Sequence, residues 1–280
     1  MKAIAYAKVN LSLEVGTKRS DGYHPYESMA MSVGLADTMS LSVSHDDERA
    51  VSVRTSTGLA DTLATQAART VLDAADVDAQ VAIHIEKQIP PGAGLAGGSA
   101  DAAATLIATR ELIDADDLDL GPLATGIGTD VPFCLNGGFA RLHGRGELVE
   151  QREPLPPFGV LIAVPPVSVS TVMVFAAFDQ VSVVPEPEPA PGWLIEIVPG
   201  CSFRNDLERA AFEVEPELPA WKAIIEDATG HTAFMSGTGS AYVCYAEDTD
   251  SLDELAPMLH REGIAAWVTE PVAYGVRTIG

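Results

Sequence analysis

Apolar and polar residues alternate along the first part of the chain, and this pattern predicts a β-sheet. The alternation covers residues 3–15, 28–35, 38–44 and 50–54, and polar or glycine-containing turns separate the four runs. Side chains of a strand point in turn to the two faces of a sheet, so a period of two indicates strands with one buried face. We therefore expect the chain to begin with four strands.

The spacing of apolar residues then changes to that of a helix at residues 61–75 and returns to that of a strand at 81–87. A second helix is expected at 99–113 and a short one at 118–126. Residues 128–138 contain glycine at both ends and are interpreted as a turn that leads into a loop. Strands and helices thus alternate in one mixed α/β unit.

A proline-rich junction follows a predicted hairpin at residues 139–150 and marks the best domain boundary. We predict an N-terminal domain of residues 1–152 and a C-terminal domain of residues 153–280. The second domain begins with an apolar strand at 160–164, continues with helices and a glycine-interrupted hairpin, and ends with a final strand at 265–270. This order is typical of a small α+β domain.

Charge and cysteine content exclude several classes of function. The net charge of −23 argues against a nucleic-acid partner or an anionic membrane surface, since both require a basic footprint. Cys134, Cys201 and Cys244 show no metal-ligand spacing and indicate a reducing cytoplasm. We see no export signal, and Pro165 and Pro166 divide the longest uncharged stretch, so we expect no membrane span.

The segment PPGAGLAGGSADAAA, residues 90–104, places four glycines directly before a predicted helix. The unpaired N–H groups and the dipole of a helix start bind phosphate, whereas a plain strand-to-helix turn is the alternative. The segment lacks the G-K-[ST] ending of a P-loop and the later acidic residue of a Rossmann motif. Ser99 either caps the helix or binds Mg²⁺, and Asp101 either complements the dipole or helps to hold the metal.

Five motifs together resemble those of the GHMP kinases. The glycine segment resembles the ATP-binding signature of that family, and AKVNLSLEVGTKRSDGYHPYESM, GTDVPF, FRNDLE and MSGTGSA occur in the family's order. The resemblance covers nearly the whole chain. It implies an α+β, two-domain GHMP kinase fold, with a mixed α/β N-terminal domain and a smaller ferredoxin-like C-terminal domain.

Within that family, the GYH segment resembles the branch that acts on a cytidine diphosphate conjugate of methylerythritol. The implied reaction is ATP-dependent phosphorylation of its 2-hydroxyl group, in the non-mevalonate route to isoprenoid precursors. The resemblance implies ATP and Mg²⁺ as cofactors and a small-molecule substrate, with no nucleic-acid or membrane partner, in a cytoplasmic monomer or weak homodimer. Another GHMP small-molecule kinase, acting on mevalonate or homoserine, is one alternative, and a catalytically silent regulatory protein on the same scaffold is another.

The resemblance also assigns site residues by position. Lys8 and Asp130 match the catalytic lysine and aspartate, with Asp130 as general base and Lys8 keeping it ionised. Asn10, Tyr23, His24, Thr171 and Phe175 match the substrate site, in which two aromatic rings enclose the base and the histidine meets its polar edge. Thr171 is equally suited to cap the following helix. The nucleotide site comprises Thr62, Lys87, Pro90, Pro91, Gly92, Ala93, Gly94, Leu95, Ala96, Gly97, Gly98, Ser99, Ala100, Gly237 and Gly239, and Ser99 is also the candidate metal ligand.

Two of these assignments have open alternatives. Thr62 stands where the family usually has an asparagine near the adenine, and its side chain has a shorter reach. Lys87 matches a lysine of the adenine pocket, but a solvated lysine at the end of a strand is an equally good interpretation. Asn205 and Asp206 of FRNDLE are interpreted as a helix cap.

Overall fold

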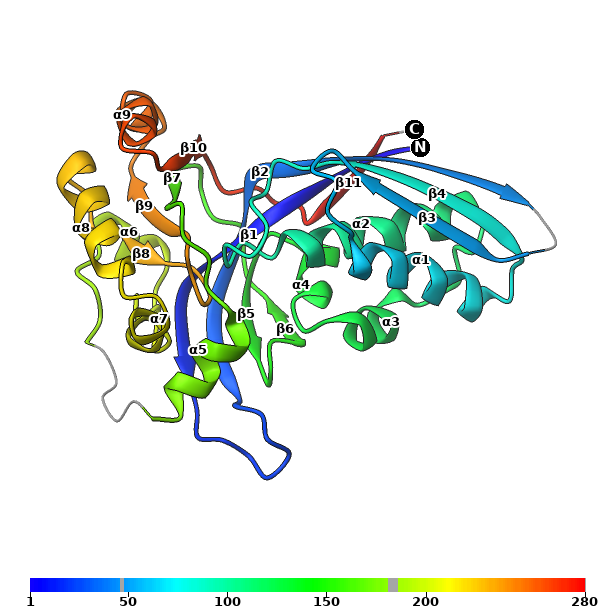
Figure 1. Cartoon of the computed structure of the whole chain (residues 1–280), viewed down its shortest axis with the longest axis horizontal. Helices are drawn as coiled ribbons and strands as arrows, with labels where there is room; N and C mark the ends of the chain where they lie inside the picture. The colour runs from blue at the N-terminus through cyan, green and yellow to red at the C-terminus, as the bar shows by residue number, and fades with distance from the viewer. Residues whose placement is uncertain (46–47, 181–185, 280) are drawn as a thin grey trace.

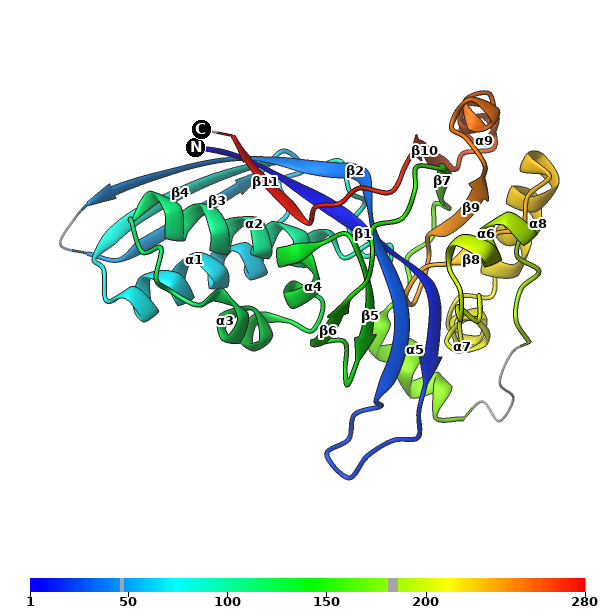
Figure 2. The same ribbon diagram turned by 180° about the vertical axis from the view of Figure 1, so that it is seen from behind.

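The computed structural model describes residues 1–45, 48–180 and 186–279, in which the chain forms two sheets with separate groups of helices (Figures 1 and 2). The first sheet has the order β11-β1-β2-β4-β3, with β5 paired to β2 and β6 to β5; β3 and β4 are parallel and the other pairs antiparallel. Its strands are β1 (Lys2–Val15), β2 (Tyr26–His45), β3 (Ala50–Thr55), β4 (Ala79–Glu86), β5 (Phe139–His143), β6 (Leu148–Gln151) and β11 (Val276–Ile279).

The second sheet is antiparallel and has the order β10-β7-β9-β8. Its strands are β7 (Gly159–Val164), β8 (Phe234–Met235), β9 (Tyr242–Ala246) and β10 (Ala265–Thr269). Helices come between β7 and β8 and again between β9 and β10, so the succession is the β-α-β-β-α-β of a ferredoxin-like unit. The predicted two-part α+β fold is confirmed.

Two groups of helices accompany the sheets. The first group lies together on one face of the first sheet in both views: α1 (Thr62–Ala75), α2 (Gly97–Leu112), α3 (Leu120–Ile127) and α4 (Val131–Asn136). The second group surrounds the second sheet: α5 (Thr171–Phe178), α6 (Gly192–Ile197), α7 (Glu208–Val214), α8 (Leu218–Thr229), the 3₁₀ turn η1 (Asp250–Leu252) and α9 (Leu255–Arg261). Among the described residues, no helix is long and apolar enough to span a membrane.

Strand β7 joins the two parts of the core because both of its faces are buried. Val160 and Ile162 belong to the large core that also holds the first sheet and α2. Leu161 and Ala163, which alternate with them, belong to a second core with α7, α8 and α9. Since alternate residues of a strand face opposite sides, one apolar run serves both cores. The second sheet therefore packs directly against the first part of the molecule.

Three predictions from the sequence pattern are wrong. The runs 28–35 and 38–44 form one strand, β2, whose pairing with β1 shifts register between Val33 and Ala36. Such a bulge changes which face a residue occupies and so interrupts the alternation without ending the strand. The predicted loop at 128–138 contains α4, since Pro132 is compatible with a first helical turn. Finally, β10 is not the last strand.

Strand β11 bears on the predicted domain division. The junction near residue 152 lies between β6 and β7, which belong to different sheets. Val276–Ile279, however, pairs with β1 in the first sheet, with Lys2 opposite Ile279. The final segment of the predicted 153–280 domain thus lies within the sheet of the other part. A cut at a single position does not separate the two sheets.

Candidate active site

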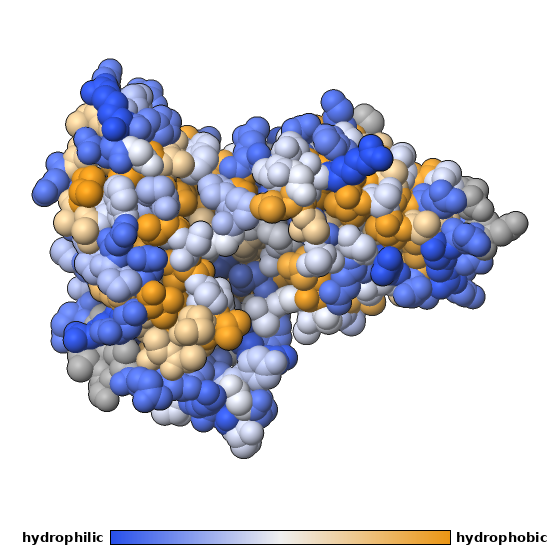
Figure 3. Space-filling view, in the orientation of Figure 1, coloured by the Kyte–Doolittle hydropathy of each residue, from blue (hydrophilic) through white to orange (hydrophobic). Residues whose placement is uncertain are grey.

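A cavity of 870 Å³ lies between the two parts of the molecule. The glycine-rich segment, the middle of β1, α5 and the loop after β8 contribute to its walls, and Figure 3 shows a recess between the two halves on this face. The lining includes the following residues from the sequence prediction: Lys8, Asn10, Tyr23, His24, Pro90, Gly92, Ala93, Gly94, Leu95, Ala96, Gly97, Gly98, Ser99, Asp130, Thr171, Phe175 and Gly237.

Lys8 and Asp130 meet in this cavity from two different elements. Lys8 lies on β1, and Asp130 directly precedes α4. The Lys8 Nζ is 3.5 Å from the Asp130 Oδ2, and the lysine side chain is only 5% exposed against 26% for the aspartate. The second carboxylate oxygen of Asp130, Oδ1, is buried and has no hydrogen-bond partner among the described residues. Because this oxygen is closed to solvent, a ligand hydroxyl can reach only the exposed part of the carboxylate, and Asp130 lines the cavity.

A chain of hydrogen bonds fixes the orientation of Lys8. Its ammonium donates to the Asn10 Oδ1 at 3.0 Å, and the Asn10 Nδ2 donates to the Ser28 Oγ at 2.6 Å. The Ser28 hydroxyl in turn donates to the Ser12 carbonyl at 2.6 Å. Because each buried polar atom of the chain has a partner, the lysine is held in place before any ligand binds.

The glycine-rich segment turns sharply before α2. Gly92 has φ +70°, Gly94 has φ +79° and Ala96 has φ +57°, which places three residues of the segment in the left-handed region. Helix α2 begins at Gly97, so Ser99 is the third residue of the helix and not its N-cap. The capping alternative for Ser99 is therefore wrong, and its hydroxyl is available to the cavity that it lines.

Two glycine loops from opposite parts of the molecule interlock at the cavity. A Cβ atom at Gly94 would lie 2.2 Å from the Ser236 carbonyl oxygen, and one at Gly237 would lie 3.2 Å from the Gly94 carbonyl oxygen. The Ser236 hydroxyl donates to that Gly94 oxygen at 3.0 Å and accepts from the Asn10 N–H at 3.2 Å. Only glycine permits this approach, so the loop after β8 helps to shape the segment that opens α2.

Five residues of the predicted nucleotide site do not line the cavity: Thr62, Lys87, Pro91, Ala100 and Gly239. Ala100 is fully buried in the core beneath α2. A Cβ atom at Gly239 would lie 3.1 Å from the Met235 Sδ and 3.9 Å from the Val169 Cγ2. Thr62 and Pro91 are exposed outside the cavity. These five positions remain predictions.

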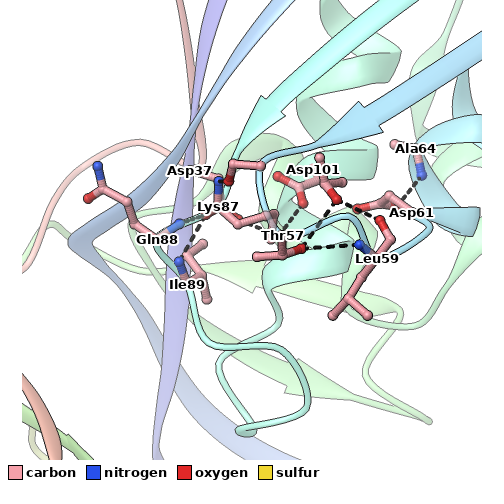
Figure 4. A network of polar contacts seen from close by, with 11 residues as sticks. Asp37, Thr57, Leu59, Asp61, Ala64, Lys87, Gln88, Ile89 and Asp101 are labelled. Carbon is pink, nitrogen blue, oxygen red and sulfur yellow. Dashed lines mark hydrogen bonds and ion pairs between the residues drawn. The ribbon is translucent and has the colours of Figure 1, made fainter.

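Lys87 is buried, so the interpretation as a solvated lysine is wrong. Its ammonium is 2.6 Å from the Asp37 Oδ2 and also contacts the Asp101 Oδ2. Figure 4 shows Lys87 between these two aspartates. Burial, reinforced by the charge of Asp37 and opposed by Lys87, raises the pKa of Asp101 to about 8. Asp101 does not line the cavity, so the structure gives no support to its role as a metal ligand.

The aromatic side chains lie at the opposite end of the cavity from α2. The His24 ring stacks on Phe175 with centroids 5.9 Å apart, while Tyr23 is 55% exposed. The His24 Nδ1 is 2.9 Å from the Gly16 carbonyl, and the Nε2 is 3.0 Å from the Asp179 Oδ1. Both ring nitrogens thus have protein partners. Thr171 does not cap α5, because Ser170 accepts the hydrogen bond from the Met173 N–H.

Arg145 also lines the cavity and was missed by the sequence analysis. It lies between Gly144 (φ +73°) and Gly146 (φ +108°) in the β5–β6 hairpin, with its guanidinium 4.5 Å from the centre of the Tyr23 ring. No carboxylate pairs with this guanidinium among the described residues. An arginine between two glycines in the hairpin was the available signal, but it was interpreted as a turn alone. Lys8 and Lys18 also line the cavity, but they pair with Asp130 and Asp179 of the same lining, so Arg145 contributes the unpaired positive charge.

Comparison with known proteins gives the same family in sequence and in structure. The profile described as "GHMP kinases N terminal domain" matches residues 62–138. A 4-diphosphocytidyl-2-C-methyl-D-erythritol kinase from Exiguobacterium sibiricum is 33% identical and covers 99% of this chain and 97% of its own length. One from Bacillus subtilis is 37% identical, with 84% of each chain covered.

The comparison with solved structures finds the same kinase as the sequence comparison. A crystal structure of 4-(cytidine 5'-diphospho)-2C-methyl-D-erythritol kinase superposes with a TM-score of 0.81 at 34% identity and covers 97% of this chain and 99% of its own. A homoserine kinase from Cytophaga hutchinsonii has a TM-score of 0.71 at 18% identity, over 100% of this chain and 97% of its own. The second likeness concerns the fold alone.

Proposed function

The chain belongs to the 4-diphosphocytidyl-2-C-methyl-D-erythritol kinases of the GHMP kinase family, and we propose that Asp130 and Lys8 are the residues with which it phosphorylates that substrate. The enzyme uses ATP, and the proposed acceptor is the 2-hydroxyl group of the methylerythritol part. The observation that carries the proposal is the Lys8–Asp130 pair at 3.5 Å, whose 26% exposed carboxylate belongs to a residue that lines the cavity.

The reaction joins the acceptor oxygen to the γ-phosphorus of ATP and breaks the bond from that phosphorus to the β-phosphate bridge. Asp130 accepts the proton that the hydroxyl loses, and ADP leaves with the electron pair of the broken bond. Lys8 keeps Asp130 ionised and stabilises the negative charge on the transferred group. Phosphoryl transfer requires mainly positioning and charge stabilisation, which the prearranged Lys8–Asn10–Ser28 chain supplies.

The glycine-rich segment and the first turn of α2 form the proposed site for the ATP phosphates. Gly97, Gly98 and Ser99 are the first three residues of a 16-residue helix and all line the cavity. Their backbone N–H groups and the helix dipole favour phosphate oxygens. Ser99 is the residue that would hold Mg²⁺ through its hydroxyl, and the ion would neutralise charge on the phosphates.

The acceptor occupies the aromatic end of the cavity in this proposal. Tyr23 and Phe175 offer ring faces for the cytosine, and the guanidinium on one face of Tyr23 leaves the other face for stacking. Because both ring nitrogens of His24 already have partners, we assign its contact with the base to the ring surface and not to its polar edge. Thr171 donates to the substrate from the start of α5, and Arg145 binds the diphosphate.

The experiment is an ADP-release assay with purified enzyme and a panel of acceptors. We expect turnover with the cytidine diphosphate conjugate and very little with free methylerythritol, because the remote cytidine supplies the binding energy that positions the hydroxyl. Mevalonate and homoserine are the competing acceptors. A preference for either would reject the cytidine assignment, and the absence of ATP-dependent turnover with every acceptor would reject the kinase role.

The proposed setting is the cytoplasm, with the enzyme as a monomer or weak homodimer. The three cysteines are free thiols, and two of them, Cys134 and Cys244, are buried. Burial raises the pKa of the Cys201 thiol to about 11, so this half-buried cysteine is protonated and unreactive at neutral pH. Unpaired, unreactive thiols support a reducing compartment.

A further inference from the structure

A buried cluster of three charged residues lies directly behind the glycine-rich segment: Asp37 on β2, Lys87 after β4 and Asp101 on α2. Both aspartate side chains have no exposed surface, and that of Lys87 is 9% exposed. None of the three lines the cavity. They therefore act on a bound ligand either through their charge or through the residues that they hold.

The cluster holds both ends of the glycine-rich segment. At the entry, the Asp37 Oδ1 accepts from the backbone N–H groups of Gln88 at 2.5 Å and Ile89 at 2.9 Å. At the exit, Asp101 lies in the second turn of α2, whose first residues line the cavity. The Lys87 ammonium contacts Asp37 and Asp101 together, so one cation connects the two ends (Figure 4).

A cluster of this kind is a poor source of stability. Taking three charges out of water costs free energy that their attraction only partly restores, and apolar residues of similar volume stabilise a core as well or better. What a buried charged cluster does provide is a defined geometry, since each oxygen accepts only at certain positions. Here that geometry fixes residues 87–89 relative to α2, and residues 90–96 lie between them.

We propose that Lys87, Asp37 and Asp101 are positioning residues for nucleotide binding, which hold the glycine-rich segment in the conformation that presents its N–H groups to the triphosphate. The inference rests on the proposed function, because it takes the ligand of this segment to be the phosphate chain of ATP. The family resemblance implies that Lys87 contacts adenine directly. We assign Lys87 the positioning role in place of that contact, since two carboxylates already bind its ammonium.

Asp101→Asn is the decisive variant, because an electrostatic role and a positioning role of Asp101 predict opposite changes in triphosphate affinity. At pH 9, above the Asp101 pKa of about 8, the substitution removes a negative charge near the phosphate site, so electrostatics alone predicts tighter triphosphate binding. Loss of the positioning contact predicts weaker binding despite the gain in charge. We expect the dissociation constant of inorganic tripolyphosphate and that of ATP to rise by at least tenfold, with the KM of the acceptor changed less than twofold.

Tripolyphosphate separates a base contact from phosphate positioning, because it has no nucleobase. Isothermal titration with Lys87→Met is expected to show equal losses for ATP and tripolyphosphate, and Lys87→Arg should recover most of both. A loss confined to ATP would establish a direct adenine contact and overturn the proposal. These binding measurements need no acceptor, so they remain informative if the acceptor assignment fails.

The matched control is a second cluster, in which the largely buried Lys222 side chain contacts Glu188 and Glu208, none of which lines the cavity. Lys222→Met removes a buried lysine from two carboxylates in the same way. We expect it to lower the melting temperature yet leave tripolyphosphate affinity unchanged. If Lys87→Met and Asp101→Asn behave like this control at a temperature where all are folded, the cluster at the glycine-rich segment is structural only and the proposal is overturned.

Discussion

Lys8 and Lys87 both have largely buried side chains beside aspartates, but only the aspartate beside Lys8 can be reached by a ligand in the cavity. Lys8 shares the cavity with Asp130, whose carboxylate is 26% exposed and keeps one oxygen without a partner. Lys87 is enclosed by two fully buried carboxylates. The first pair has a partly exposed carboxylate on a cavity-lining residue, whereas the second uses its cation to join protein segments.

The difference shows that burial and an ion pair do not by themselves identify a catalytic lysine. What distinguishes the two is whether a reacting group can reach the partner carboxylate. Asp130 lines the cavity and Asp101 does not. A strongly shifted pKa can equally mark a structural cluster. Access to the carboxylate is therefore the property that the following experiments test.

The largest effect is expected from Asp130→Asn. The amide cannot accept the hydroxyl proton, so kcat should fall roughly 10²–10⁴-fold, the range for loss of a general base. ATP affinity should change little, because the role assigned to Asp130 is proton transfer from the acceptor and not a contact with the ATP phosphates. Steady-state kinetics and nucleotide titration measure both quantities. Near wild-type turnover would mean that Asp130 is structural.

Stability should separate the two lysines next. Lys87→Met leaves two buried carboxylates without a cation, and the free energy of unfolding should fall by about 3–5 kcal/mol. Lys8→Met leaves a partly exposed carboxylate that water can still solvate, so its loss should be less than half as large. Urea denaturation of both variants provides the comparison. Equal losses would remove the distinction drawn between them.

Substitution of the cavity residue Arg145 should weaken the use of the acceptor without lowering the stability of the fold. Arg145→Gln removes charged hydrogen bonds to the diphosphate, worth about 1.5–3 kcal/mol, so kcat/KM for the conjugate should fall about 10- to 100-fold. Arg141→Gln, in the same hairpin, is the matched control because Arg141 pairs with the exposed Glu27 outside the cavity. Comparable losses in the two variants would contradict the assignment of Arg145 to the diphosphate.

The smallest effect concerns the Lys222 cluster and its pH dependence. Burial raises the pKa of Glu208 to about 7, although Lys222 opposes the rise. The folded protein then holds this proton more tightly than the unfolded chain, so the associated stability is complete below the ordinary glutamate pKa and is lost as the pH rises towards 7. Glu208→Gln should flatten the slope of the unfolding free energy against pH, between pH 5 and 7, by about 1 kcal/mol per pH unit. Parallel slopes for the two proteins would show that Glu208 does not titrate there.

Local patterns predicted those features of the fold that depend on neighbouring residues. Helix α1 begins after Asp61, whose carboxylate accepts from the Ala64 N–H as an N-cap does, and its buried alanines follow the helical period. Strand β11 has no such signal, because its place is fixed by pairing with β1 at the other end of the sequence. The bulge that joins two runs into β2 is likewise set by pairing between strands.

Contacts between distant segments also limited the prediction of the site. Motif resemblance placed Lys8 and Asp130 together, but it carries no information on which buried groups already have partners. Asp37 was not singled out, although it fixes the entry to the glycine-rich segment through two backbone N–H groups. Asn205 and Asp206 were interpreted as a helix cap; α7 begins at Glu208 without a side-chain cap, and Asn205 instead donates to the Met235 and Gly237 carbonyls. Such contacts between distant segments arise only in the folded chain.

The pairing of β11 with β1 has a consequence for biosynthesis. Strand β1 is synthesised long before β11, so one edge of β1 has no partner while the intervening chain is being made. An unpaired edge is a template for association with other strands. The first sheet of this protein therefore lacks one strand, and keeps an exposed edge on β1, until Val276–Ile279 emerges.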